Sequence, residues 1–173
     1  IHRTLSQLTE EAPVTITRTT LERMIYDVNS QLVVTSILII FLAVIAVSIS
    51  DYLNSHIVKF IFGRVRPCNE LPKETIHLLL GCPPNPSFPS SHASNIFALS
   101  IVLVYRYRVL LFYMPIIAVL VCLSRVYLGV HYPFDVIGGG VCGILYGSMV
   151  IFLYNQIVRK NEGKKGIEGQ KVE

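Results

Sequence analysis

Residues 32–50 read LVVTSILIIFLAVIAVSIS, an apolar run that contains no charged side chain. At a rise of about 1.5 Å per residue, a helix of this length crosses the roughly 30 Å of hydrocarbon in a bilayer. The pattern continues past Asp51 with no helix breaker before Gly63. We therefore expect one long membrane helix that leaves the hydrocarbon near Asp51 and that Arg66-Pro67 terminates.

The overall composition is also typical of a membrane protein. Of the 173 residues, 52% are hydrophobic and 15% are charged, with a mean hydropathy of +0.55. An ordinary soluble domain has about 25% charged residues. The net charge of +4 does not indicate nucleic-acid binding, because the basic residues flank apolar runs or lie in the last fifteen residues instead of forming one face.

Three more apolar runs follow, at residues 90–105, 109–124 and 135–154. Ser90 is a good N-cap for the first of them. The last is rich in glycine, which permits close approach between helices. The sequence thus predicts an all-α integral membrane protein, a helical bundle of about four transmembrane helices.

The two ends of the chain differ from this apolar centre. Residues 1–31 are predicted to be an amphipathic N-terminal segment whose helix leads into the first span. Residues 1–158 are predicted to form a single membrane-embedded domain. Residues 159–173 are charged and contain glycine, which predicts a disordered cytoplasmic tail.

Four spans would place the 51–89 loop and the 125–134 turn on one side of the membrane. Most of the lysines and arginines then lie on the opposite side, namely Arg3, Arg18, Arg23, Arg106, Arg108, Arg159, Lys160, Lys164, Lys165 and Lys171. Because cytoplasmic segments carry an excess of Lys and Arg, the tail is expected in the cytoplasm and the loop is expected to face outward. If the loop faces an oxidising compartment, Cys68 and Cys82 could form a disulfide, although spacing alone leaves this open.

Three polar clusters are expected on the outward side. Lys59 and Arg66 are seven residues apart, hence on one face if the helix continues that far. Pro89-Ser90-Ser91-His92 begins a helix, where free N–H groups and the helix dipole favour an anion. The stretch SRVYLGVHYPFD (residues 124–135) carries Arg125, His131 and Asp135. Each cluster alone could be an ordinary cap or an interfacial anchor.

Together the clusters supply three cations, several neutral donors and two histidines, one of them near an aspartate. Cations and amides would neutralise the equatorial oxygens of a phosphoryl group, while one histidine attacks and the other protonates the leaving oxygen. No spacing of Cys, His or acidic residues suggests a metal centre. The sequence therefore predicts phosphoryl transfer without a metal or another cofactor.

In their order and internal spacing, the clusters resemble the signature of the type 2 phosphatidic acid phosphatase superfamily, K-x6-R-P, P-S-G-H and S-R-x5-H-x3-D. The resemblance covers about residues 32–155, and Ser91 stands in place of the signature glycine. The chain is similar to compact bacterial lipid phosphatases, and this likeness implies a bacterial inner membrane with the outward side facing the periplasm. The resemblance implies hydrolysis of a lipid phosphate in the bilayer, with lipid A 1-phosphate as the first substrate and phosphatidylglycerophosphate or undecaprenyl pyrophosphate next.

The resemblance also implies a role for each matching residue. His131 would be the nucleophile that forms a phosphohistidine, Asp135 would orient it, and His92 would protonate the departing lipid oxygen. The phosphate would be held by Lys59, Arg66, Ser90, Ser91 and Arg125.

Two other functions are compatible with the same residues. Vanadate-dependent haloperoxidases share the signature, although those relatives are soluble. A non-catalytic protein that binds or transports anionic lipids would keep the cations, but it would not need His131 or Asp135.

Overall fold

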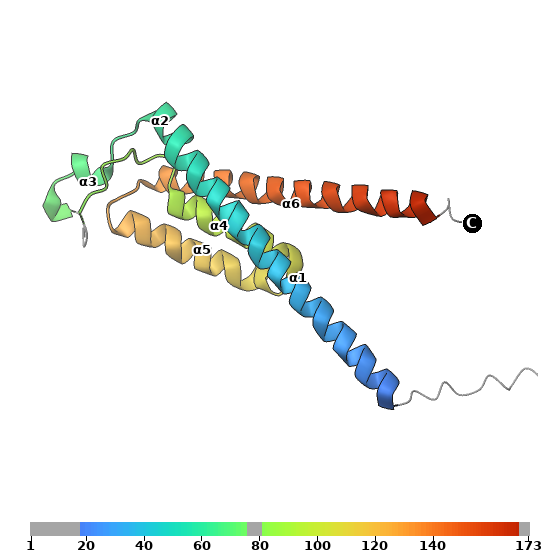
Figure 1. Cartoon of the computed structure of the whole chain (residues 1–173). Coiled ribbons are helices and arrows are strands. Elements are labelled where there is room, and N and C mark those ends of the chain that lie inside the picture. Colours follow the sequence, from blue (N-terminus) through green and yellow to red (C-terminus); the bar gives the residue numbers. More distant parts are fainter. Residues whose placement is uncertain (1–17, 76–80, 170–173) are drawn as a thin grey trace, which may run out of the picture. The chain divides into compact units, whose positions relative to one another are not determined.

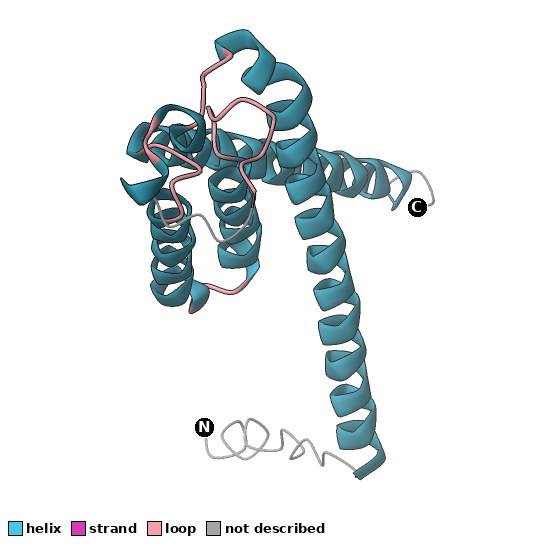
Figure 2. Cartoon of the chain, turned by 90° about the vertical axis from the view of Figure 1, so that its left-hand side faces the viewer, coloured by secondary structure: helices cyan, strands magenta, loops and turns pink. Residues whose placement is uncertain are grey.

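The structure is a computed structural model that describes residues 18–75 and 81–169. Contacts within the chain divide it into two compact units, residues 1–37 and residues 38–173. All the regular secondary structure in the described residues is helical, joined by loops (Figure 2). The all-α class predicted from the apolar runs is therefore confirmed.

The first unit contains the N-terminal part of helix α1 (Arg18–Leu53). Residues 18–31 of the predicted amphipathic segment belong to α1 and continue without a break into the apolar run at 32–50, as expected. The rest of that segment, residues 1–17, lies outside the described residues.

In the second unit, α1 leads through a π-helical turn (Asn54–Val58) into the short helix α2 (Lys59–Phe62). The helix ends there because Gly63 takes the left-handed conformation, with φ of 55°, which glycine adopts without steric cost. The expectation that the helix runs on to Arg66-Pro67 is therefore wrong. Arg66 is extended, as a residue before proline usually is, and Pro67 begins the next short helix, α3 (Pro67–Glu70).

Helices α4 (Ser91–Arg106), α5 (Leu110–Tyr127) and α6 (Pro133–Gly169) follow near their predicted positions (Figure 1). Helix α4 packs against both α5 and α6. Glycines let α6 approach the α4 backbone closely, since a Cβ on Gly139 would lie 2.4 Å from the Ser90 carbonyl oxygen and one on Gly143 would lie 2.2 Å from that of Ser94. The close helix contact predicted from the glycines is confirmed.

The buried apolar core joins α1, α4 and α6 and consists of Ile39, Leu42, Ala43, Ala46, Ala98, Val102, Val150 and Ile151. Many large apolar side chains remain on the outside, among them Phe112, Ile116 and Leu120 of α5. An exposed apolar surface of this extent marks contact with lipid or protein.

Three helical segments are long and apolar enough to cross a membrane, at Thr20–Phe62, Leu110–Tyr127 and Pro133–Gly163. Helix α4, at 16 residues, would be only about 24 Å long. A bundle of four membrane-crossing helices therefore stays a prediction. Helix α6 extends to Gly169, so residues 159–169 are helical where the sequence predicts a disordered tail. Lys, Arg and Glu lose little conformational freedom in a helix, and an existing helix propagates easily into such a segment.

Candidate active site

A cavity of about 630 Å³ opens in the second unit where the loops between the helices meet. It gathers residues from all three of the sequence clusters. Its lining consists of Asp51, Ser55, Lys59, Arg66, Gly81, Pro83, Asn85, Ser91, His92, Arg125, Leu128, Val130 and His131. Of the eight predicted site residues, only Ser90 and Asp135 do not line it.

His131 and Asp135 form a buried pair at the start of α6. Their side chains are 4% and 0% exposed, and His131 Nδ1 lies 3.6 Å from Asp135 Oδ2. This distance is longer than a hydrogen bond, but Nδ1 is the ring nitrogen that faces the carboxylate. Asp135 also accepts a 2.8 Å hydrogen bond from the Tyr132 N–H. With Pro133 as the first helical residue, this contact is the backward half of a capping box.

Burial lowers the pKa of the His131 imidazole below its ordinary value of about 6.5. The Asp135 carboxylate opposes this shift, whereas the positive charges of Arg66 and Lys59 reinforce it. His131 is therefore neutral at neutral pH, with the Nδ1 edge toward Asp135 and the Nε2 edge toward Arg66. A neutral imidazole is the form that acts as a nucleophile.

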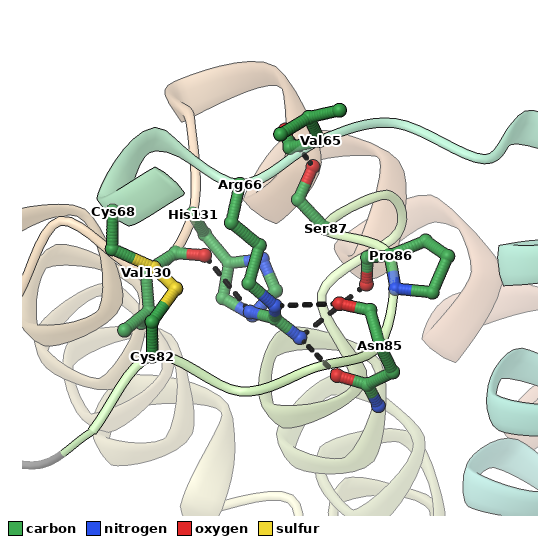
Figure 3. The surroundings of a disulfide bond; sticks show 9 residues. All are labelled: Val65, Arg66, Cys68, Cys82, Asn85, Pro86, Ser87, Val130 and His131. Atoms are coloured by element: carbon green, nitrogen blue, oxygen red, sulfur yellow. Dashed lines mark hydrogen bonds between the residues drawn. A yellow bond between two sulfur atoms is a disulfide. The ribbon is translucent and has the colours of Figure 1, made fainter. Parts of the chain in front are cut away.

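The guanidinium of Arg66 is held by a ring of oxygens from the loop before α4 (Figure 3). Its Nε donates to the Asn85 carbonyl at 2.8 Å, and its Nη2 donates to the Asn85 side-chain oxygen at 2.6 Å and to the Pro86 carbonyl at 3.3 Å. Its Nη1 donates to the Val130 carbonyl at 2.9 Å and lies 3.3 Å from His131 Nε2. Arg66 thus touches the nitrogen expected to attack.

Two further cations reach the cavity from helix ends. Lys59, 4% exposed, follows the π-helical turn, a feature that recurs at functional sites. Arg125 lies in the last turn of α5, where its Nε donates to Ser124 Oγ at 3.2 Å. Lys59 and Arg66 do not share a helix face as the sequence suggested, because the helix ends at Gly63. The extended segment that follows brings Arg66 to the same cavity instead.

The start of α4 separates the roles of two adjacent serines. Ser90 is fully buried and caps the helix, since its side chain accepts from the Ala93 N–H. Ser91 Oγ lines the cavity and is buried without a hydrogen-bond partner among the described residues. His92 follows it and lines the same cavity. The hydroxyl available to a phosphate is therefore that of Ser91, the residue in the place of the signature glycine.

Three side chains near the site were not singled out from the sequence. Asn85 holds Arg66, Asp51 brings a carboxylate to the cavity wall, and Arg64 lies 3.1 Å from Asp135. Asn85 sits in a proline-rich loop where no spacing marks it. Arg64 could have been identified from the sequence, because it is a second arginine only two residues before the signature residue Arg66.

A disulfide joins Cys68 of α3 to Cys82, with their Cα atoms 5.9 Å apart (Figure 3). The disulfide lies within the segment between Arg66 and Asn85, and Asn85 is the residue whose oxygens hold the Arg66 guanidinium. The pairing that spacing left open is thus present in the structure.

The profile of the PAP2 superfamily matches residues 32–161. The chain belongs to the PAP2 superfamily. The match contains all eight predicted site residues.

Curated relatives include an undecaprenyl-diphosphatase, BcrC, of Bacillus subtilis, which is 29% identical over 64% of this chain and 55% of its own length. A lipid A 4'-phosphatase of Bacteroides thetaiotaomicron is 28% identical over 73% of this chain and 58% of its own. An undecaprenyl-diphosphatase of Sulfolobus acidocaldarius is 37% identical over 62% of this chain and 50% of its own. The chain thus spans between half and three-fifths of the length of these relatives.

A solved structure is also similar, that of a transmembrane PAP2-type phosphatidylglycerolphosphate phosphatase from Bacillus subtilis. It is 30% identical with a TM-score of 0.54, and the match covers 68% of this chain and 59% of the other. The likeness supports a multi-pass membrane protein of the same fold.

Within the described residues, no three His, Cys, Asp or Glu side chains are grouped as a metal site. Metal-independent chemistry remains a prediction from the signature.

Proposed function

We propose that this protein is a membrane lipid phosphatase that removes a phosphate group through a phosphohistidine at His131. One observation carries the proposal. A single cavity collects Lys59, Arg66 and Arg125 together with His92 and His131, and the Asp135 carboxylate lies directly behind His131. This arrangement supplies positive charge for a phosphate, a nucleophile and a second proton-transfer group.

In the first step, His131 Nε2 forms a bond to phosphorus while the bond from phosphorus to the lipid oxygen breaks. Burial and the charge of Arg125 lower the pKa of His92 before substrate binds, so His92 takes up its proton when the negatively charged phosphate binds beside it. His92 then gives this proton to the leaving oxygen, so that the lipid leaves as an alcohol or as a lipid monophosphate. The three cations and the Ser91 hydroxyl stabilise the charge on the phosphoryl oxygens. The imidazole becomes positively charged as it is phosphorylated, and the Asp135 carboxylate, 3.6 Å from Nδ1, offsets that charge.

In the second step, His92 removes a proton from water as the water oxygen attacks phosphorus. The bond between Nε2 and phosphorus breaks, and orthophosphate leaves. The same histidine thus acts as an acid and then as a base, as microscopic reversibility requires.

Arg66 Nη1 contacts His131 Nε2, so the bound substrate must displace the guanidinium before Nε2 can attack. At 3.3 Å, the guanidinium occupies the direction from which Nε2 must reach phosphorus. Phosphate oxygens are stronger acceptors for arginine than an imidazole nitrogen is. A bound phosphate is therefore expected to draw Nη1 away and free the nucleophile.

The site is proposed to face the outside of the cytoplasmic membrane, with the C-terminal end in the cytoplasm. The distribution of Lys and Arg supports this orientation. The disulfide beside the cavity supports it independently, because such bonds persist in oxidising compartments.

Related proteins act on undecaprenyl diphosphate, lipid A 4'-phosphate or phosphatidylglycerolphosphate, according to their names. We propose a substrate of this class, with lipid A 1-phosphate tested first and phosphatidylglycerophosphate and undecaprenyl pyrophosphate next. The cavity of about 630 Å³ is large enough for a phosphate and part of a leaving group.

The test is orthophosphate release from these lipids and from phosphatidic acid by the purified protein in detergent. H131A and H92A should lose activity. The matched control is H56A, since His56 is exposed and stacks on Tyr52 away from the cavity lining. Full activity in both H131A and H92A would contradict the mechanism. Lipid depletion without orthophosphate release would instead favour a lipid-binding or transport protein.

A further inference from the structure

Asp135 contacts two different groups through its two oxygens. Oδ2 accepts from the Tyr132 N–H at 2.8 Å and faces His131 Nδ1 at 3.6 Å. Oδ1 accepts a 3.1 Å hydrogen bond from Nη1 of Arg64, which lies 71 positions earlier in the chain. The carboxylate is thus held from both sides.

The charge on Asp135 needs a partner because the side chain is completely buried. A buried carboxylate without a counter-charge is costly and tends to take up a proton instead. His131 does not supply that counter-charge in the resting enzyme, because burial keeps its imidazole neutral. The cation in direct contact with the carboxylate is Arg64.

Arg64 itself is held in place for this contact. Its guanidinium lies 4.2 Å from the centre of the Tyr132 ring, within the range of a cation–π interaction. Its backbone carbonyl accepts a 2.8 Å hydrogen bond from the Ser87 N–H, which ties its segment to the loop before α4. Arg64 does not line the cavity, unlike the three cations proposed to bind phosphate.

We propose that Arg64 is a positioning residue for the proposed reaction, which keeps Asp135 ionised and directs its second oxygen at His131. The inference rests on the proposed function, because it assigns Arg64 to the support of the same nucleophile. Asp135 can then stabilise the imidazolium that forms during phosphoryl transfer without making His131 too basic beforehand.

Removal of the Arg64 charge impairs His131 by one of two routes, and both become more damaging as the pH falls. If Asp135 stays ionised, its negative charge is no longer offset, and His131 holds a proton up to a higher pH. If Asp135 takes up a proton, it no longer orients His131. The other charged or titratable groups that face His131 are Arg66, Lys59 and His92, and none of them changes. Activity should therefore be lost first on the acid side.

The experiment compares R64Q with the wild-type protein, both full-length in detergent. The ionisation of His131 is followed by NMR of ring-labelled histidine, with H131A used to assign the signal, and orthophosphate release is measured across pH. We expect the His131 midpoint to move by about one pH unit, upward if Asp135 stays ionised and downward if it takes up a proton. We also expect kcat at neutral pH to fall, by about fourfold at most if only the midpoint rises and by about 10–100-fold if Asp135 no longer orients His131. KM should change little, because Arg64 does not touch substrate.

The matched control is R106Q, since Arg106 also lies over a tyrosine ring, that of Tyr107, but at the opposite end of α4. It should change neither the midpoint nor kcat. The NMR readout separates the two proposals. An inactive wild-type protein would contradict the phosphatase proposal, whereas an unchanged His131 midpoint in R64Q would overturn the role of Arg64 whatever the activity.

Should R64Q not fold because Asp135 is left unpaired, D135N provides the background in which that pair is already broken. If Arg64 acts through Asp135, adding R64Q to D135N should change the residual kcat by less than about twofold. A further tenfold loss in the double variant would overturn the proposal.

Discussion

Gly143 of α6 is where a single methyl group should disturb the site from a distance. A Cβ at this position would lie 2.2 Å from the Ser94 carbonyl oxygen of α4, whereas ordinary contacts begin at 3.4 Å. G143A therefore requires α4 and α6 to separate by about 1.2 Å. Because the obstacle is backbone, no side-chain rotation can relieve it.

This separation acts directly on the catalytic geometry, since α4 carries His92 at its start and α6 carries Asp135 in its first turn. A misplacement of about 1 Å can cost about 100-fold in rate. Overpacking of this kind lowers the free energy of unfolding by about 1–3 kcal/mol. We expect G143A to lose about 100-fold in kcat for orthophosphate release and to unfold at a lower temperature in detergent.

The control for G143A is G163A in the same helix, where a Cβ would meet nothing within 4 Å. It should keep full activity and thermal stability, because alanine is the better helix former. If G143A were as active and as stable as G163A, the close packing of α4 on α6 would not be what sets the position of His92 relative to Asp135.

Two further predictions concern pH and the disulfide. Burial lowers the pKa of His131, so the neutral nucleophile persists to lower pH and is lost only as the pH falls through that lowered value. The acid limb of the pH profile of kcat/KM should therefore lie below about pH 6.5. An acid limb above that pH would contradict a buried neutral nucleophile. Reduction of the Cys68–Cys82 disulfide, or the substitution C68S, should loosen the loop that holds Arg66 and lower kcat/KM several-fold. The control C122S removes a free cysteine and should have no effect. Equal activity with and without reductant would contradict this role of the disulfide.

The helices could be predicted from the sequence because each one carries its own signal. The uncharged run at 32–50 and the N-cap at Ser90 are local features, and the structure has helices where they indicate them. The end of the first long helix was misjudged because Arg66-Pro67 looked like a stronger stop than Gly63. The left-handed conformation at Gly63 ends the helix one turn earlier.

The candidate site could be predicted as a set of residues, but its inner contacts could not. The signature brings Lys59, Arg125 and His131 together by resemblance, and the cavity contains all three. The contacts of Arg66 with Asn85 and of Arg64 with Asp135 join positions 19 and 71 residues apart. Such pairs depend on how the loops between helices fold back, and no periodicity in the sequence encodes that.

The most direct test of the proposed mechanism is to trap the phosphorylated enzyme. With an aryl phosphate whose leaving group departs without protonation, H92A should still phosphorylate His131 but should hydrolyse the intermediate slowly, because no base activates the water. Rapid mixing should then show a burst of phenolate equal to the enzyme concentration, with alkali-stable, acid-labile phosphate that maps to His131. No burst and no labelled histidine in H92A, prepared alongside wild-type protein that releases orthophosphate, would contradict the phosphohistidine mechanism.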